Sequence, residues 1–181
     1  MSKKLWIFFD RMPGTQADLR KLALDGSHHV TTVLQTPANE RNGIVSPDGR
    51  RIAYQSDQSG QDEIYVRPFP ETSSGPWKVS TNGGTRPMWA PDGKELYYVA
   101  STRGDPIMRV AVQPGSSTWQ VATPVKLFEG YAAGSPSRTY DVAPDGRFLM
   151  MKTSPEGQPP PPRLIIVQHW DEEVKARVPT H

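Results

Sequence analysis

The sequence predicts an all-β fold built from repeated antiparallel units. Three observations lead to this prediction: a tripeptide that recurs along the chain, an excess of turn-forming residues, and short β-branched and aromatic runs between the turns. The 181 residues include nineteen prolines and fifteen glycines, whereas these two residues make up roughly 12% of an average protein. They are spread along the chain between the short runs, a pattern typical of short strands joined by tight turns.

The recurring tripeptide is Pro-Asp-Gly. It stands at Pro47, Asp48 and Gly49, at Pro91, Asp92 and Gly93, and at Pro144, Asp145 and Gly146, with intervals of 44 and 53 residues. The blades of WD-type propellers repeat about every 40–45 residues. The spacing therefore predicts a partial β-propeller of about four antiparallel blades in a single domain over residues 1–181. The approximate blades are 4–34, 42–80, 86–128 and 138–168, and the first is incomplete.

The residue types of the tripeptide suit the closing turn of a β-hairpin. Pro presets φ at about −65° for the first central position of a type I turn, Asp can accept hydrogen bonds from nearby backbone amides, and Gly takes the left-handed conformation that follows. We therefore interpret the three Asp residues as turn formers. A ring of catalytic or metal-binding carboxylates is the weaker alternative, because each Asp already has a turn to explain it.

Each Pro-Asp-Gly turn lies between two strands and is followed by further strands. The strands directly after the turns are predicted at 51–54, 95–99 and 147–150, the third strands at 63–67, 107–112 and 164–167, and outer strands at 77–79 and 125–128. Four short antiparallel strands in each repeated unit are the pattern of a propeller. Acidic residues precede basic ones over 170–178, which predicts a short C-terminal helix that ends at Pro179.

Local propensity and the repeat disagree over residues 15–26. Leucines at positions 19, 22 and 24, with Asp18 before them and Gly26 behind, resemble a capped helix. The repeat register instead aligns 18–21 with 63–66, so we predict a strand, because a repeat outweighs local propensity. On this register the first blade lacks its innermost strand. The chain is then expected to be a fragment, or a half-ring that pairs with another chain, since propellers close with about four to eight blades.

The stretch Val45–Tyr54, followed by Ser56-Asp57 and Glu63–Val66, resembles the TolB-like, WD-like β-propeller repeat family. The closest likeness is to the C-terminal propellers of bacterial receptor-type serine/threonine protein kinases, and it is carried by 34–37, 39–43, 62–70 and 165–179. The resemblance implies a propeller over nearly the whole chain. It implies no single function, because propellers have many roles.

The sequence contains no catalytic constellation. A kinase needs a Gly-rich loop, a strand lysine, and His-Arg-Asp and Asp-Phe-Gly motifs, and a serine hydrolase needs a Gly-x-Ser-x-Gly elbow; none of these is present. Gly83-Gly84 lacks the lysine and helix that follow a phosphate-binding loop, so we interpret it as a turn between blades. We therefore expect a chain that is not an enzyme and holds no cofactor.

Charge and composition exclude further classes of function. The net charge is +2, from 21 basic and 19 acidic residues without a basic block, so no nucleic-acid partner is expected. The chain has no cysteine and four histidines without ligand spacing, so no metal is expected. No apolar run approaches the length of about 18 residues that a membrane span needs. As written, without an export signal, the chain is expected in the cytoplasm, and outside the membrane if a larger anchored parent carries it.

The leading functional hypothesis is a non-catalytic module that binds a protein, peptide or small ligand on a propeller face. Arg86, Arg103 and Arg138 lie near predicted strand starts or loops and are the candidate contact residues. The alternative is a regulatory C-terminal part of a larger enzyme, such as a serine/threonine protein kinase or a propeller-bearing peptidase, without activity in this chain. A third reading is an inert truncation product. Uncovered end blades also predict self-association to complete the propeller.

Overall fold

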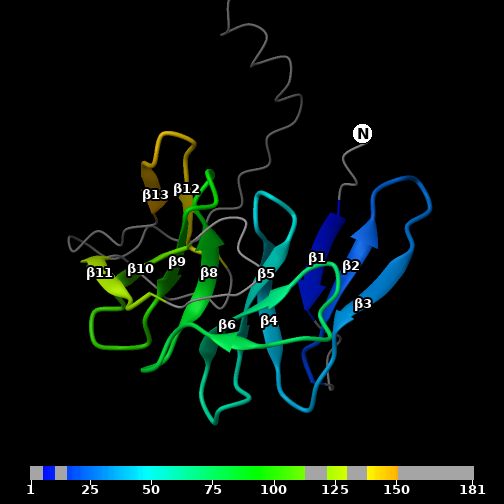
Figure 1. Cartoon of the computed structure of the whole chain (residues 1–181), viewed down its shortest axis with the longest axis horizontal. Coiled ribbons are helices and arrows are strands. Elements are labelled where there is room, and N and C mark those ends of the chain that lie inside the picture. The colour runs from blue at the N-terminus through cyan, green and yellow to red at the C-terminus, as the bar shows by residue number, and fades with distance from the viewer. Residues whose placement is uncertain (1–5, 11–15, 113–121, 130–137, 151–181) are drawn as a thin grey trace, which may run out of the picture.

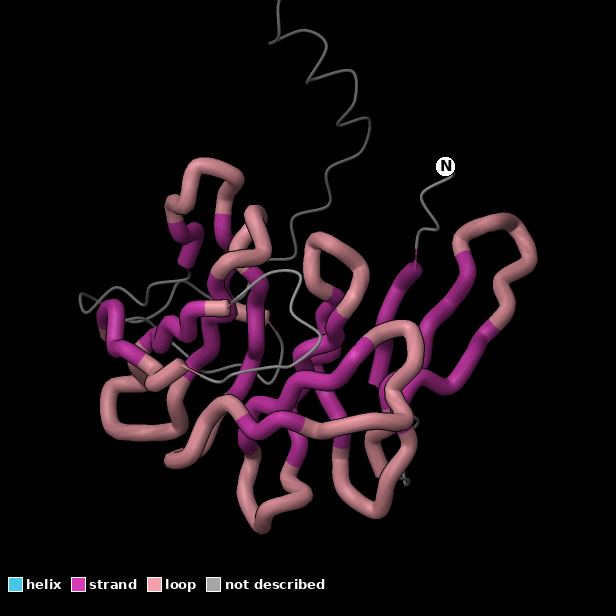
Figure 2. The backbone as a smooth tube through the Cα atoms, in the orientation of Figure 1, coloured by secondary structure: helices cyan, strands magenta, loops and turns pink. Residues whose placement is uncertain are grey.

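The structure, a computed structural model, describes residues 6–10, 16–112, 122–129 and 138–150 (Figure 1). In these ranges the chain forms strands, turns and loops, and no helix (Figure 2). The first sheet contains β1 (Trp6–Asp10), β2 (Leu19–Ala23) and β3 (Val30–Leu34), and the second contains β4 (Glu40–Val45), β5 (Arg51–Ser56), β6 (Glu63–Pro68) and β7 (Trp77–Lys78). The third contains β8 (Thr85–Trp89), β9 (Glu95–Val99), β10 (Ile107–Ala111) and β11 (Val125–Phe128), and the fourth β12 (Tyr140–Val142) and β13 (Phe148–Met150).

This architecture confirms the predicted all-β fold of antiparallel sheets. In the second and third sheets, strands consecutive in the sequence are neighbours in space, which is the meander of a propeller blade. The predicted strand at 164–167 and the predicted helix at 170–178 lie outside the described residues. The blade boundaries given above stay predictions.

The conflict over residues 15–26 is resolved as a strand. Residues 19–23 form β2, which pairs with β1 on one side and β3 on the other. Leu19 is buried against the second sheet, where it packs with Ile52 and Tyr54. This burial is worth about 1.5–3 kcal/mol for a large apolar side chain, more than the few tenths that helix propensity offers at one position.

Three hydrophobic clusters hold the sheets together, and each joins two neighbouring sheets. The first joins the β1–β3 and β4–β7 sheets through Leu19, Leu34, Ile52, Tyr54 and Tyr65. The second joins the β4–β7 and β8–β11 sheets through residues that include Ala53, Ile64, Val66, Trp89, Leu96 and Val110. The third joins the β8–β11 and β12–β13 sheets through residues that include Tyr97, Val99, Ile107, Tyr140 and Val142. The core is thus divided into layers between successive sheets.

Strand β5 shows why these sheets stack face to face. All six of its residues are buried, although side chains of a strand alternate between the two faces. Ile52 and Tyr54 belong to the cluster shared with the first sheet, whereas Ala53 belongs to the cluster shared with the third. A strand buried on both faces needs a sheet on either side, which the propeller arrangement supplies.

The connections between strands lie at two opposite edges of the molecule. The three Pro-Asp-Gly turns lie along the upper edge in Figure 1, between β4 and β5, β8 and β9, and β12 and β13. The β3–β4, β5–β6 and β9–β10 connections lie along the lower edge. We call these the turn edge and the loop edge. Chemistry that depends on the Pro-Asp-Gly turns is therefore separated from chemistry that depends on these three connections.

Replacing Gly49 by valine is expected to lower the free energy of unfolding by about 1–2 kcal/mol, because a β-branched side chain is strained at positive φ. The φ of Gly49 is 72°, and a Cβ at this position would meet no atom within 4 Å, so the loss is conformational rather than steric. Urea unfolding measures it. Gly49→Asn is the matched control, since asparagine tolerates the left-handed region; equal losses for the two variants would contradict the turn geometry.

Candidate binding face

The carboxylates of the Pro-Asp-Gly turns are occupied by the turns themselves. The Oδ1 atoms of Asp48, Asp92 and Asp145 accept hydrogen bonds from the backbone N–H two residues later, at 3.1, 2.9 and 3.1 Å. Burial opposes ionisation of Asp48, but bonds from the Ser46 hydroxyl and the Arg50 backbone outweigh it and hold the pKa of Asp48 below its usual value. These contacts are those expected of turn-forming residues, and no site is assembled around them.

The structure places the three candidate arginines in different settings. Arg86 lies in β8, half-buried, with φ 55° and its guanidinium Nη1 3.4 Å from the Thr139 hydroxyl to which it donates. Arg103 is exposed in the β9–β10 connection, and Arg138 is exposed just before β12. The arginines therefore do not form one cluster of exposed cations, and their role in contacts stays a prediction.

Arg86 belongs to a line of hydrogen bonds that crosses three sheets along their inner strands. Asn42 in β4 and Arg86 in β8 both have positive φ, 53° and 55°, and both sit where the pairing with the next strand shifts register. The Asn42 side-chain amide donates to Gln55 Oε1 at 3.0 Å, and the same oxygen accepts from the Arg86 backbone N–H at 3.4 Å. The Tyr140 hydroxyl donates to the Arg86 carbonyl at 2.8 Å. These contacts link the β4, β8 and β12 positions of successive blades.

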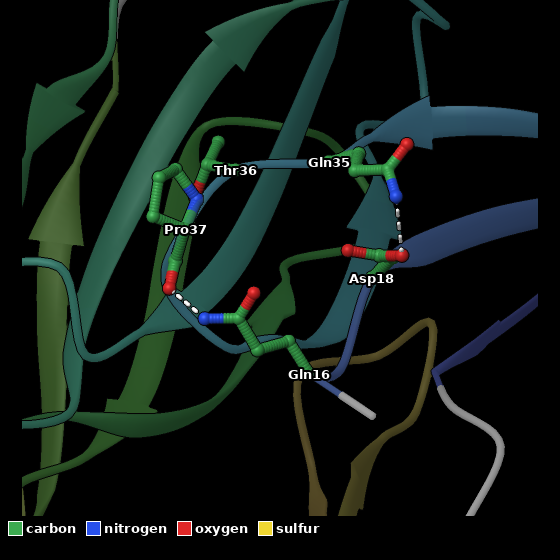
Figure 3. Close-up of a pocket in the computed structure, with 5 residues that line it drawn as sticks. All are labelled: Gln16, Asp18, Gln35, Thr36 and Pro37. Carbon is green, nitrogen blue, oxygen red and sulfur yellow. Dashed lines mark hydrogen bonds between the residues drawn. The ribbon is translucent and has the colours of Figure 1, made fainter. Parts of the chain in front are cut away.

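Two open cavities lie at the loop edge, on either side of Thr36 and Pro37 in the β3–β4 connection. One has a volume of about 450 Å³ and is lined by Gln16, Asp18, Gln35, Thr36 and Pro37 (Figure 3). The other has a volume of about 440 Å³ and is lined by Thr36, Pro37, Ala38, Asp57 and Gln58. Both volumes fall within the range of about 300–1,000 Å³ that is usual for ligand pockets. We call the first the Asp18 cavity and the second the Asp57 cavity.

Two carboxyl groups beside this connection are in different states. Asp57 accepts from the backbone N–H and the side-chain amide of Asn39, at 2.8 and 2.7 Å, and the backbone bond above all holds the pKa of Asp57 below its usual value. Glu40, 0% exposed, accepts from the Thr36 hydroxyl through Oε1, while its Oε2 has no hydrogen-bond partner among the described residues. Burial raises the pKa of Glu40, and the charges of Asp18 and Asp57 raise it further.

In two of the sheets, a latch of hydrogen bonds ties an acidic residue at the start of one strand to the connection that follows the next strand. Glu63, at the head of β6, accepts from the Ser80 hydroxyl and from the Gly83 backbone N–H at 3.1 Å, and pairs with Lys78 at 3.2 Å. At the equivalent place in the first sheet, Gln35 donates to Asp18 at 3.1 Å. Asp18 is thus the counterpart of Glu63. The sequence register that aligns residues 18–21 with 63–66 is the signal that could have identified Asp18 as the counterpart of Glu63.

Replacing Glu40 by glutamine is expected to raise the free energy of unfolding by about 1 kcal/mol at pH 7. The pKa of Glu40 is raised in the folded state, so its contribution to stability is complete below its unfolded pKa and is lost as pH rises through the folded pKa. Glutamine does not titrate, and it carries no charge that the charges of Asp18 and Asp57 could repel. The gain should therefore shrink toward pH 4, as measured by urea unfolding at each pH.

The matched control for this prediction is Glu71→Gln, which removes the same charge from an exposed position. Its effect on stability is expected to be small. A stability gain of Glu40→Gln that did not change between pH 4 and pH 8 would show that Glu40 does not titrate in this range.

Neither a metal centre nor a membrane span is found in the part of the chain that the structure describes. In that part, no three His, Cys, Asp or Glu residues converge as metal ligands, Asp18, Glu40 and Asp57 included. No helix there is long and apolar enough to cross a membrane.

Known proteins resemble this chain in sequence and in fold. No protein-family model matches it. It is 34% identical over 106 residues to the Tol-Pal system protein TolB of Alcanivorax borkumensis, covering 57% of this chain and 24% of that protein. It is 32% identical over 66 residues to the uncharacterized peptidase YuxL of Bacillus subtilis, covering 33% of this chain and 10% of that protein. A puromycin-hydrolyzing peptidase of Mycobacterium tuberculosis superposes with a TM-score of 0.57 at 16% identity, covering 80% of this chain and 25% of that one.

These comparisons support the resemblance to TolB-like propeller repeats. The chain matches about a quarter of the length of TolB and a tenth of that of YuxL. The superposition on the peptidase shows the fold alone, because the identity is low. The particular likeness to the propellers of receptor-type kinases stays a prediction.

Proposed function

We propose that this TolB-like propeller is a non-catalytic recognition module that binds a protein or peptide partner at its loop edge. The observation that carries the proposal is the pair of open cavities, about 450 and 440 Å³, on either side of Thr36 and Pro37. A chain that crosses this connection can place one side chain in each cavity. The polar lining suits the hydrogen-bonding groups of a peptide backbone and its side chains.

Further features support a protein partner. The loop edge is formed by connections between strands, and binding residues are disproportionately found on such loops, held by a rigid scaffold. The A. borkumensis relative is named as a protein of the Tol-Pal system. In this proposal Arg103 and Arg138, both exposed, serve as peripheral contacts, and Arg86 positions the inner strands.

A selection with random peptides displayed on phage, using the immobilised full chain as bait, tests this function. Peptides selected by the chain are expected to lose binding to Gln58→Trp, which fills the Asp57 cavity from an exposed position. The matched control is Arg50→Trp, an exposed position at the turn edge, which should bind them as well as the original chain. Failure to enrich any peptide, or loss of binding only in Arg50→Trp, would reject recognition at the loop edge.

A second candidate function is a regulatory propeller within a larger enzyme, without activity in this chain. The observation that favours it is the likeness to YuxL in sequence and to the M. tuberculosis peptidase in fold. A peptidase or kinase domain encoded in the same reading frame would favour this candidate.

We also propose that two copies associate to complete the ring. β1 holds the place in the first sheet that β5 and β9 hold in theirs, and among the described residues it pairs with β2 alone. Such strand edges are templates for further pairing. Light scattering on the purified chain is expected to give a discrete dimer near twice 20.1 kDa, and a monomer at all concentrations would rule out this association.

A further inference from the structure

We propose that the Asp18 cavity is a subsite for a cationic hydrogen-bond donor, the ammonium or guanidinium group of a lysine or arginine side chain on the partner. This inference rests on the proposed recognition function and names the chemistry that the function selects.

The Asp18 carboxylate offers one oxygen to the cavity. Its Oδ2 accepts from the Gln35 side-chain amide at 3.1 Å and lies 3.6 Å from the Arg20 guanidinium. Figure 3 shows the other oxygen pointing away from Gln35, into the space between Gln16, Thr36 and Pro37. Asp18 is only 8% exposed, so this oxygen is held in place by packing as well as by the Gln35 bond. A fixed, partly desolvated carboxylate oxygen is a strong acceptor for a charged donor.

Gln16 supplies a second acceptor from the opposite wall. Its Nε2 donates to the Pro37 carbonyl, so its Oε1 is the amide atom left as an acceptor. The Oε1 atom then faces the same space as the free oxygen of Asp18, as Figure 3 shows. Two acceptors on facing walls suit a group that has several N–H donors and no acceptor, which describes an ammonium or a guanidinium.

The electrostatic surroundings favour a cation over a neutral donor. Glu40 is fully buried, and its Oε2 has no hydrogen-bond partner among the described residues; in its ionised form it adds to the negative charge of Asp18. Arg20 approaches Asp18 from the Oδ2 side and is not among the residues that line the cavity. Because the described residues contain no three converging carboxylates or histidines, the geometry points to a donor cation and not to a metal ion.

The Asp57 cavity lacks this arrangement, although it also has a carboxylate in its wall. Both oxygens of Asp57 are held by Asn39, at 2.8 and 2.7 Å. Its carboxylate is committed to the fold of the connection, whereas that of Asp18 keeps one oxygen for a ligand. The two cavities are therefore expected to accept different side chains of one bound segment.

Binding of methylguanidinium chloride to the full chain, followed by the NMR signals of the Gln16 and Gln35 side-chain amides, tests the subsite. We expect saturable shifts of these signals with methylguanidinium and none with methylurea, its neutral isostere. Asp18→Asn, which keeps an oxygen for the Gln35 bond, should weaken binding at least 10-fold, while Glu71→Gln, which removes the same charge at an exposed position, should leave it unchanged.

Shifts with methylurea equal to those with methylguanidinium would overturn the cation subsite. The same conclusion would follow if Asp18→Asn bound methylguanidinium as well as the original chain does, with its other NMR signals unchanged. The outcome for the subsite can be distinguished from the outcome for the recognition function tested by the phage selection. Enriched peptides that lack basic residues, together with no methylguanidinium binding, would reject the subsite and keep the recognition function. Enriched peptides with a lysine or arginine whose binding is lost in Asp18→Asn would support both.

Discussion

Replacing Trp89 by alanine is expected to lower the free energy of unfolding by about 3–5 kcal/mol, the range for deleting a buried aromatic side chain. Trp89, in β8, is 4% exposed and packs in the cluster between the second and third sheets. Its indole N–H also donates to the Ile44 carbonyl in β4 at 3.1 Å, so the side chain joins two sheets by packing and by a hydrogen bond. Urea or thermal unfolding of the purified variant measures the loss.

Trp89→Phe separates the two contributions. The phenyl ring fills most of the space but cannot donate to Ile44, so the loss is expected to be about 1–3 kcal/mol, from the missing hydrogen bond and the small remaining cavity. Trp77→Ala is a control for the loss of an indole at a half-buried place in β7. A loss in Trp89→Ala no larger than that in Trp77→Ala would contradict the role of Trp89 between the sheets.

Replacing Glu63 by alanine is expected to lower the free energy of unfolding by about 3 kcal/mol at pH 7. Glu63 is fully buried, and its removal leaves Ser80 and the Gly83 backbone N–H without their acceptor and Lys78 without its partner. Burial opposes ionisation of Glu63, but the bonds from Ser80, and after it those from the other donors, outweigh this and hold the pKa of Glu63 below its usual value.

The pH dependence gives this prediction a second readout. Because the folded pKa of Glu63 is lowered, its contribution to stability is complete above its unfolded pKa and is lost as pH falls through the folded pKa. The difference between the original chain and Glu63→Ala should therefore narrow in acid. Glu71→Ala, at an exposed position, should change stability by less than about 0.5 kcal/mol. If the loss of stability in Glu63→Ala became larger below pH 4, the result would contradict an ionised Glu63 that binds Ser80, Gly83 and Lys78.

Much of the fold could be predicted from the Pro-Asp-Gly repeat, because turn chemistry depends on adjacent residues. Gly49, Gly93 and Gly146 all have positive φ, 72°, 72° and 84°, as their places in the turns require. The repeat also corrected a local signal: residues 19–23 have helical spacing of leucines but form β2, since burial of Leu19 between sheets outweighs propensity. Both successes come from information that is local or repeated in the sequence.

The loop-edge site could not be predicted in the same way, because its residues come together only through packing. Gln16 and Asp18 precede β2, Thr36 and Pro37 precede β4, and Asp57 follows β5. Nothing in these short polar stretches distinguishes them from ordinary loop residues. Arg86, Arg103 and Arg138 lie near predicted strand starts or loops in the sequence. Such a position does not predict the direction in which a side chain points. The Oε2 atom of buried Glu40, which has no hydrogen-bond partner among the described residues, can likewise be identified only from the structure.

The hydrogen bonds along the inner strands involve different residue types in successive blades. Asn42, Arg86 and Thr139 hold equivalent places relative to their Pro-Asp-Gly turns, yet they present an amide, a guanidinium and a hydroxyl. Gln55, which accepts from both Asn42 and Arg86, corresponds in the next blade to apolar Val99. If the second and third repeats exchanged places, every Pro-Asp-Gly turn would be kept. The residues at these inner-strand positions, however, would face neighbours with which they do not form the present hydrogen bonds. Repeats that share their turns are thus not interchangeable, and the order of the blades is encoded at their inner strands.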